Sequence, residues 1–144
     1  MHILFIYGTL KHGHRNAALL KHAEFLGSAI TNDAAYTMVA VNDPACDYAY
    51  PGVILGGSGK IVGELYRIDA ATLAVIDRLE AQGVDYNRQF ITITDSTNNT
   101  IDAMIYLFIN AQNSPVMTTH PHILRGMRDG DNFYEWVTLD NQPV

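Results

Sequence analysis

The residue in this sequence with the clearest potential for chemistry is Glu80, which ends a stretch of helical periodicity. At about 100° per residue, Glu80 falls between Leu73 and Ile76 on the helix surface. It lies at the edge of an apolar face that also holds Val75 and Leu79. Burial on such a face disfavours a charged carboxylate, and the negative end of the helix dipole acts in the same direction. Both effects raise the pKa toward the range useful for proton transfer, so Glu80 is a candidate general acid and base.

Helical geometry also allows a purely structural role for Glu80. A glutamate at the edge of an apolar face can extend its carboxylate to solvent, or it can pair with Arg88. Asp77 projects further round the helix and Arg78 lies on its opposite side, so neither is expected to face the apolar residues. The periodicity alone leaves the catalytic and the structural interpretation open.

A second candidate site is the turn Tyr7-Gly8-Thr9-Leu10, which follows the apolar run Ile3-Leu4-Phe5-Ile6. The run is typical of a buried strand. Glycine in the turn lets successive backbone N–H groups converge on an anion, and a carboxylate is one such anion. A plain structural turn explains the same pattern, so this signal needs support from elsewhere in the chain.

Two other patterns are weaker signals of a site. The run Gly56-Gly57-Ser58-Gly59-Lys60 lacks the first glycine of a phosphate loop, and Ile61 stands where that motif needs Ser or Thr. The histidine pairs match no standard zinc spacing and are expected to be solvated loop residues; they are His12 with His14 and His120 with His122. We therefore expect neither a nucleotide site nor a metal site.

Cys46 lies in a turn-rich acidic segment beside Asp47, which raises a thiol pKa and disfavours a nucleophilic thiolate. As the single cysteine it cannot form an intramolecular disulfide. The chain does not open with a charged leader followed by an apolar segment and a cleavage site. The expected compartment is therefore the cytoplasm.

The composition excludes several classes of protein. The 144 residues fit one domain spanning 1–144, and 48% hydrophobic with 17% charged residues indicates a packed chain rather than a disordered one. Nine Lys and Arg residues with a net charge of -6 provide no basic surface for nucleic acid. The longest apolar stretches are too short for a membrane helix. No nucleic-acid or membrane partner is expected.

The elements that position these residues are mostly short strands, which predicts an α+β fold with a compact, mixed, mostly antiparallel, barrel-like sheet and few helices. Asp69 is expected to cap a helix from Ala70 to about Gln82 that Gly83 ends. The tail from Asn113 is expected to be irregular. The other expected elements are a helical turn at 17–20, strands at 25–30 and 36–41, a loop at 42–52, a hairpin of 53–55 with 61–68, and a hairpin of 88–94 with 101–109.

The sequence resembles the gamma-glutamyl cyclotransferase-like superfamily, in particular its branch of gamma-glutamylamine cyclotransferases and AIG2-like bacterial proteins. The resemblance extends over about residues 1–108. It rests on Phe5-Ile6-Tyr7-Gly8-Thr9-Leu10-Lys11 with Gly13 and Asn16, Phe25-Leu26-Gly27, Tyr50-Pro51-Gly52, Val62-Gly63-Glu64-Leu65-Tyr66, Ile76-Asp77-Arg78-Leu79-Glu80, Tyr86, Arg88, and Ala103 before Tyr106. Residues 113–144 form a divergent tail.

The resemblance implies a function and a set of site residues. The α-amine of a γ-glutamyl amine attacks its own γ-carbonyl and releases 5-oxoproline with the free amine, without a metal or an organic cofactor. Glu80 takes the place of the family's catalytic acid and base. The implied substrate-binding residues are Tyr7, Gly8, Thr9, Leu10, Tyr86 and Tyr106.

Several alternatives remain at this point. The chain is expected to act as a monomer or homodimer on a small γ-glutamyl substrate. A catalytically inactive protein that binds a small ligand on the same scaffold is the main alternative, and hydrolysis of the γ-glutamyl bond to glutamate is a third. A further hypothesis is that the tail from Asn113 covers the pocket mouth and selects the amine.

Overall fold

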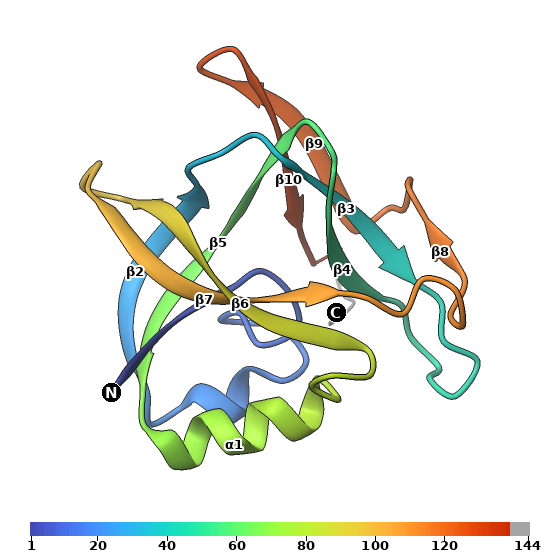
Figure 1. Ribbon diagram of the computed structural model, residues 1–144, viewed down its shortest axis with the longest axis horizontal. Coiled ribbons are helices and arrows are strands. Elements are labelled where there is room, and N and C mark those ends of the chain that lie inside the picture. Colours follow the sequence, from blue (N-terminus) through green and yellow to red (C-terminus); the bar gives the residue numbers. More distant parts are fainter. Residues whose placement is uncertain (139–144) are drawn as a thin grey trace.

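In the computed structural model, which describes residues 1–138, the chain forms a sheet-rich fold with one α-helix along one end (Figure 1). The strands of the described residues are β1 (His2–Ile6), β2 (Glu24–Thr31), β3 (Tyr36–Val41), β4 (Tyr50–Leu55), β5 (Gly59–Ile68), β6 (Tyr86–Asp95), β7 (Thr100–Phe108), β8 (Val116–Met117), β9 (Ile123–Arg128) and β10 (Asp131–Trp136). The helices are the 3-10 helix η1 (Ala17–Leu20) and the α-helix α1 (Ala70–Leu79).

Five strands close into a barrel in the order β1-β7-β6-β2-β5, and β5 pairs back to β1. Four of these five pairings are antiparallel, whereas β1 and β7 run parallel where Leu4 lies opposite Met104. The predicted mixed, mostly antiparallel, barrel-like sheet with few helices is therefore confirmed. The strands expected at 25–30 and 36–41 and the β6–β7 hairpin are confirmed as well.

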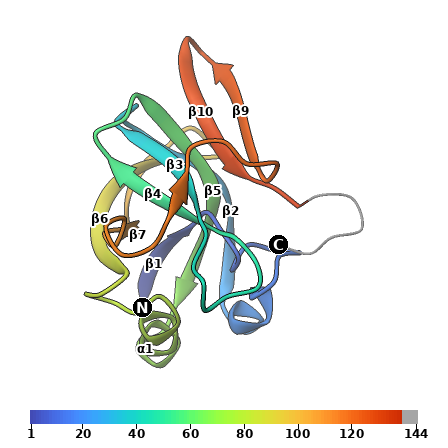
Figure 2. The same cartoon turned by 90° about the vertical axis from the view of Figure 1, so that its right-hand side faces the viewer.

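The long strand β5 joins the barrel to a second group of strands. Residues 62–68 of β5 pair with β1 and β2, whereas its first residues, Gly59 to Ile61, pair with β10. Strand β10 in turn pairs with β9, and this hairpin extends away from α1 at the opposite end of the molecule (Figure 2). Strand β3 pairs with β4 and β8 and touches the start of β5.

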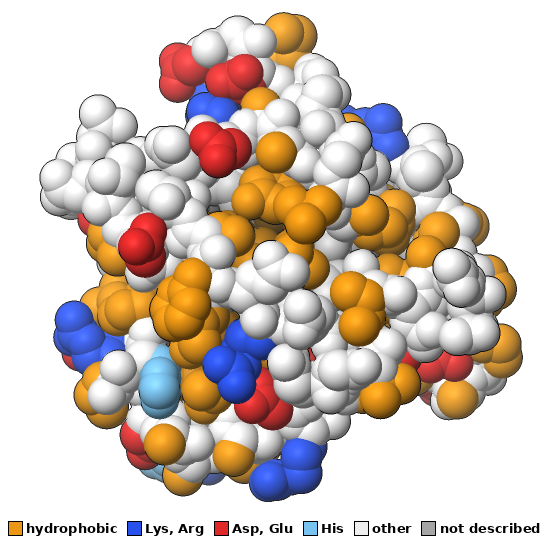
Figure 3. Space-filling model, in the orientation of Figure 1, with side chains coloured by type: hydrophobic (Ala, Val, Ile, Leu, Met, Phe, Trp, Pro, Cys, Tyr) orange, Lys and Arg blue, Asp and Glu red, His pale blue; other side chains and the backbone are white. Residues whose placement is uncertain are grey.

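The buried side chains form two clusters, one inside the barrel and one between the sheet and the helices. The first contains Phe5, Leu65, Ile105 and Trp136, each 0% or 1% exposed. The second packs the buried α1 residues Leu73 and Ile76 against β1, β5 and β7. One helix covers only part of a barrel, and a space-filling view shows apolar side chains at the surface near the middle of one face (Figure 3).

Helix α1 begins as the sequence predicts and ends three residues earlier. The Asp69 carboxylate accepts a hydrogen bond of 2.8 Å from the Thr72 N–H, which confirms the expected N-cap. The helix ends at Leu79, with Glu80 as its C-cap, rather than near Gln82. The next residue, Ala81, has φ +47 and cannot continue the helix.

Two predictions for residues 50–68 are wrong. Residues 53–55 pair with β3, not with 61–68, because the N–H groups of Gly56 and Gly57 donate to the Ala35 carbonyl and turn the chain away from a hairpin. Residues Tyr50-Pro51-Gly52, expected in a loop, begin β4. Within the described residues β4 pairs with β3 alone, so it is an edge strand that tolerates a proline.

The tail was expected to be irregular, and this prediction is also wrong for the three strands that it contains. It forms β8, β9 and β10, while residues 139–144 lie outside the described residues. The missed signal is Asp129-Gly130, whose positive φ angles of 52 and 83 make the two-residue turn of the β9–β10 hairpin. Trp136, which ends this hairpin, is fully buried in the core.

The histidines near this hairpin correct another expectation. His120 and His122 are partly buried and stack on each other and on Trp136, with ring centroids 5.2 to 5.6 Å apart. His14 is also partly buried, and burial, Lys11 and His122 lower its pKa to about 4. His120 and His122 are structural residues rather than solvated ones because their rings stack on Trp136, and so is His14, because burial stabilises its neutral ring.

None of the helices among the described residues has the length and apolar character required to cross a membrane.

Candidate active site

A cavity of about 230 Å³ opens between the loop after β1, the end of α1 and the segment that leads into β4. It brings together all seven predicted site residues, which are Glu80, Tyr7, Gly8, Thr9, Leu10, Tyr86 and Tyr106. The other lining residues are Phe5, Ile6, Asn16, Asp43, Cys46, Tyr48, Tyr50, Pro51, Leu79 and Asp85. Residues separated by up to a hundred positions thus share one site.

The loop of residues 7–10, which we call the cradle, presents backbone donors to this cavity. The hydrogen bonds found among residues 1–138 include none donated by the N–H groups of Gly8, Thr9 and Leu10. Asn16 fixes the loop, because its N–H donates to the Thr9 carbonyl at 2.6 Å and its side-chain amide donates to Thr9 Oγ1 at 2.9 Å. A fixed loop with unused N–H groups is suited to bind an anion.

Glycine is required in the cradle for a steric reason. A Cβ at Gly8 would lie 2.6 Å from Cγ of Pro51 in strand β4. The proline ring cannot move aside as a flexible side chain could, so any larger residue would displace the cradle from β4. The close approach of these two segments forms one wall of the cavity.

Lys11, the residue that follows the cradle, anchors this loop in the protein interior. Its side chain is 6% exposed, and its Nζ donates to the Trp136 carbonyl at 2.6 Å and lies 3.8 Å from the Glu135 carboxylate. The β9–β10 hairpin therefore supports the cradle through Lys11, although none of the described residues of this hairpin lines the cavity. The hypothesis that the tail covers the pocket mouth receives no support from residues 113–138.

Glu80 projects into the cavity from the C-terminal end of α1 and is partly buried. Within the described residues, no hydrogen bond or ion pair is made to its carboxylate. Burial, followed by the nearby charge of Asp85, raises the pKa of Glu80 to about 7. A carboxyl group with this pKa exchanges protons readily near neutral pH.

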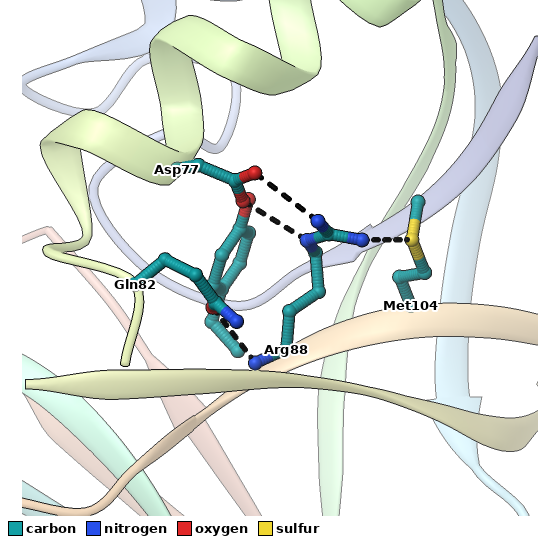
Figure 4. A network of polar contacts seen from close by, with 5 residues as sticks. Asp77, Gln82, Arg88 and Met104 are labelled. Atoms are coloured by element: carbon teal, nitrogen blue, oxygen red, sulfur yellow. Dashed lines mark hydrogen bonds and ion pairs between the residues drawn. The ribbon is translucent and has the colours of Figure 1, made fainter. Parts of the chain in front are cut away.

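The proposed structural partner of Glu80 is engaged elsewhere. Arg88 binds the Asp77 carboxylate through Nε at 2.9 Å and Nη2 at 3.1 Å (Figure 4). The prediction that Asp77 points away from the packed face of the helix is therefore wrong, as is the pairing of Glu80 with Arg88. Helical periodicity shows how residues are distributed around the helix axis, but it does not show that β6 brings Arg88 beside Asp77.

Three tyrosines form a wall of the cavity, and their hydroxyl groups are bound within the protein. Tyr7 Oη donates to the Tyr106 carbonyl and Tyr86 Oη to the Pro51 carbonyl, each at 2.7 Å. Tyr106 Oη donates to Asp77 at 2.5 Å. Burial is the main cause that raises the pKa of all three, so they remain neutral. Their rings shape the cavity, and their hydroxyl groups are occupied by these hydrogen bonds.

One part of the cavity, which we call the acidic part, was not predicted from the sequence. It includes Asp43 and Tyr48 from the segment between β3 and β4, Tyr50 at the start of β4, and Asp85. Tyr50-Pro51-Gly52 was noted only as part of a motif, and no periodicity marks Asp43 or Asp85. Cys46 also lines this part, and burial, Asp43 and Asp47 raise its pKa, which agrees with the expectation that it is a poor nucleophile.

No three His, Cys, Asp or Glu side chains gather into a group that could hold a metal ion anywhere in residues 1–138.

Comparisons with known proteins identify the family of the chain. A family model described as "Gamma-glutamyl cyclotransferase, AIG2-like" matches residues 4–126. Gamma-glutamylcyclotransferase family protein YtfP of Escherichia coli K12 is 38% identical over 89 residues, which cover 61% of this chain and 70% of that protein. A Vibrio cholerae protein, provisionally named a gamma-glutamylcyclotransferase, is 36% identical over 107 residues, or 74% of this chain and 82% of that one.

The fold is also found among solved structures. The crystal structure of an AIG2-like protein from Mus musculus superposes with a TM-score of 0.62 and 24% identity, covering 84% of this chain and 80% of that chain. The cradle, the glutamate at the end of α1 and all of the barrel except the first two residues of β1 lie within the matched residues 4–126. The chain therefore belongs to the family of AIG2-like gamma-glutamyl cyclotransferases.

Proposed function

We propose that this protein is a γ-glutamylamine cyclotransferase, which converts a γ-glutamyl amine to 5-oxoproline and the free amine. The observation that carries the proposal is the position of Glu80. A partly buried carboxylate with a pKa of about 7 and no cationic partner among the described residues faces the same cavity as the unused N–H groups of the cradle. The names of the related proteins point to the same reaction class.

The cradle binds the common half of every such substrate. The N–H groups of Gly8, Thr9 and Leu10 receive the α-carboxylate of the glutamyl group. This contact fixes the α-amine and the γ-carbonyl of one molecule within the same small cavity. Holding the two reacting groups close together removes much of the entropic barrier to forming a five-membered ring.

Glu80 moves a proton in both halves of the reaction. Its carboxylate accepts a proton from the α-ammonium group, and the resulting amine attacks the γ-carbon to form the new C–N bond. The protonated Glu80 donates its proton to the amide nitrogen as the original γ-amide C–N bond breaks. The regenerated carboxylate then takes the second proton from the ring nitrogen and passes it to the released amine, which leaves as an ammonium ion. The pKa of about 7 suits a group that must serve as base and then as acid.

The acidic part of the cavity favours an amine over an amino acid as the leaving group. Its described lining includes the acidic residues Asp43 and Asp85, and no Lys or Arg side chain is among the lining residues of that region. An amino acid would bring a second carboxylate into this acidic surrounding without a basic partner. An amine that lacks a carboxylate avoids that cost.

The test is product formation from a matched set of substrates. We would incubate wild type and Glu80→Gln with γ-glutamyl-butylamine and γ-glutamyl-norvaline, which differ by one carboxylate, and measure 5-oxoproline. The proposal predicts release by wild type only, with the butylamine substrate preferred. Glutamate as the product would indicate hydrolysis, and binding without turnover would indicate a ligand-binding protein.

A further inference from the structure

Arg88 holds the chain on both sides of Glu80. Its guanidinium group binds the Asp77 carboxylate, and its backbone N–H donates to Gln82 Oε1 at 2.9 Å (Figure 4). Asp77 lies three residues before Glu80 and Gln82 lies two residues after it. One residue of β6 therefore fixes the end of the helix and the turn that follows.

The same network reaches the cradle through the neighbouring strand. Tyr106 lies opposite Arg88 in the β6–β7 register, and its hydroxyl group donates to Asp77. Its carbonyl accepts the hydrogen bond from Tyr7, the first residue of the cradle. Asp77, Arg88 and Tyr106 thus connect the base-bearing end of α1 to the loop that would hold the substrate.

The segment that carries Glu80 needs such support. The Glu80 carboxylate makes no hydrogen bond with any of the described residues, so no contact of the carboxylate fixes the direction of the side chain. The next residue, Ala81, has φ +47, a left-handed conformation that is unfavourable for a residue with a Cβ. A strained turn persists only where contacts on both sides hold it.

We infer that Asp77, Arg88 and Gln82 position Glu80 for proton transfer in the proposed cyclisation. The inference rests on the function proposed above. None of the three residues lines the cavity, so they act through Glu80 and do not contact the substrate. They are positioning residues rather than catalytic ones.

Loss of this network should change the pKa of Glu80 as well as lower the stability of the protein. Asp85 and the hydroxyl groups of Tyr7, Tyr86 and Tyr106 are the titratable groups that face Glu80. Burial is the largest cause of its raised pKa. If the end of α1 loosens, water reaches the carboxylate and the pKa falls from about 7 toward the ordinary value of 4.5.

The experiment measures the pKa of Glu80 directly and turnover separately. Protein with ¹³C-labelled glutamate is titrated by NMR, with Glu80→Gln used to assign the signal, in wild type, Asp77→Asn, Arg88→Lys and Gln82→Ala. We expect Asp77→Asn to lower the pKa by about one unit or more. The kcat should fall about 10- to 100-fold, as is typical when a reacting group is misplaced, while KM changes less than about twofold.

The other two variants remove smaller parts of the network. Arg88→Lys keeps the positive charge and the backbone N–H donor to Gln82 but loses the bidentate contact with Asp77, so its kcat should lie between those of wild type and Asp77→Asn. Gln82→Ala leaves the ion pair intact and loosens only the turn. If Asp77→Asn does not fold, Gln82→Ala is the variant that tests whether the network positions Glu80.

The matched control is Glu24→Gln, which breaks the exposed pair of Glu24 with Arg67 at 2.6 Å between β2 and β5. It removes an ion pair of the same kind at a distance from the cavity and should change neither the Glu80 pKa nor kcat. A wild-type pKa and kcat in folded Asp77→Asn, or in Gln82→Ala if the first variant is unfolded, would overturn the inference. If wild type releases no 5-oxoproline, the proposed function fails, while the NMR titration still tests the positioning.

Discussion

Replacing Glu80 with Gln should stabilise the protein at alkaline pH while it removes activity. The pKa of Glu80 is about 7 in the folded protein and has an ordinary value of 4.5. An acid whose pKa is raised by folding favours the folded state while it is protonated, and this advantage disappears as the pH rises from 4.5 through 7. Glutamine has almost the same shape and stays neutral, so it avoids the cost of a buried charge.

The size of the effect follows from the two pKa values. One pKa unit corresponds to about 1.36 kcal/mol, so the full difference corresponds to roughly 3 kcal/mol above pH 7. Because Glu80 is partly exposed, solvent screening lowers this to about 2 kcal/mol. For a protein of this size that equals an increase in Tm of roughly 4–8 °C at pH 8. At pH 5, where most of Glu80 is protonated, the two proteins should melt within a few degrees of each other.

The assay is thermal unfolding of both proteins at pH 5 and pH 8, followed by circular dichroism. The exposed Glu24→Gln variant provides the same chemical change at the surface and should stay within about 0.5 kcal/mol of wild type at both pH values. A lower Tm for Glu80→Gln at pH 8 would refute the reasoning, because it would mean that the ionised carboxylate is stabilised by a partner. An equal gain at both pH values would show that charge is not the cause.

The remaining predictions concern the walls of the cavity and its support. For wild type, kcat/KM should increase as the pH rises through about 7 in steady-state assays, because Glu80 must be ionised to accept a proton. Gly8→Ala should raise KM and cost about 1–3 kcal/mol in urea unfolding, since its Cβ would collide with Pro51. Tyr86→Phe should cost about 1–2 kcal/mol in the same assay by leaving the buried Pro51 carbonyl without its donor. Trp136→Ala should cost about 3–5 kcal/mol because it empties a fully buried site, and an unchanged melting curve would contradict this.

The features that the sequence predicted are those with local causes. Asp69 caps α1 through a hydrogen bond to a residue three positions away, and the Thr97-Asn98-Asn99 turn joins two strands that are adjacent in the chain. The periodicity of α1 directed attention to Glu80, and the glycine turn after the first apolar run directed it to residues 7–10. The family resemblance supported both and added Tyr86 and Tyr106, and all seven residues line one cavity.

The features that the sequence did not predict depend on contacts between distant segments. Strand β4 could pair with either β3 or β5 on the basis of its residues, and the choice is made by hydrogen bonds from the glycine turn to Ala35. Arg88 could reach either Asp77 or Glu80, and the early end of the helix decides between them. Asp43 enters the cavity only because the segment between β3 and β4 folds over it.

The closure of the barrel by β1 has a consequence for the order in which the chain can fold. Leu4 pairs with Met104, and Tyr7 donates to the carbonyl of Tyr106, so β1 finds its last partner in the barrel only after β7 has been made much later in synthesis. Such long sequence separation slows folding and leaves strand edges open to aggregation in the meantime. The cradle therefore takes its final form only when the barrel closes. During synthesis, the ability to bind a γ-glutamyl ligand would report that the whole barrel, and not a part of it, has been completed.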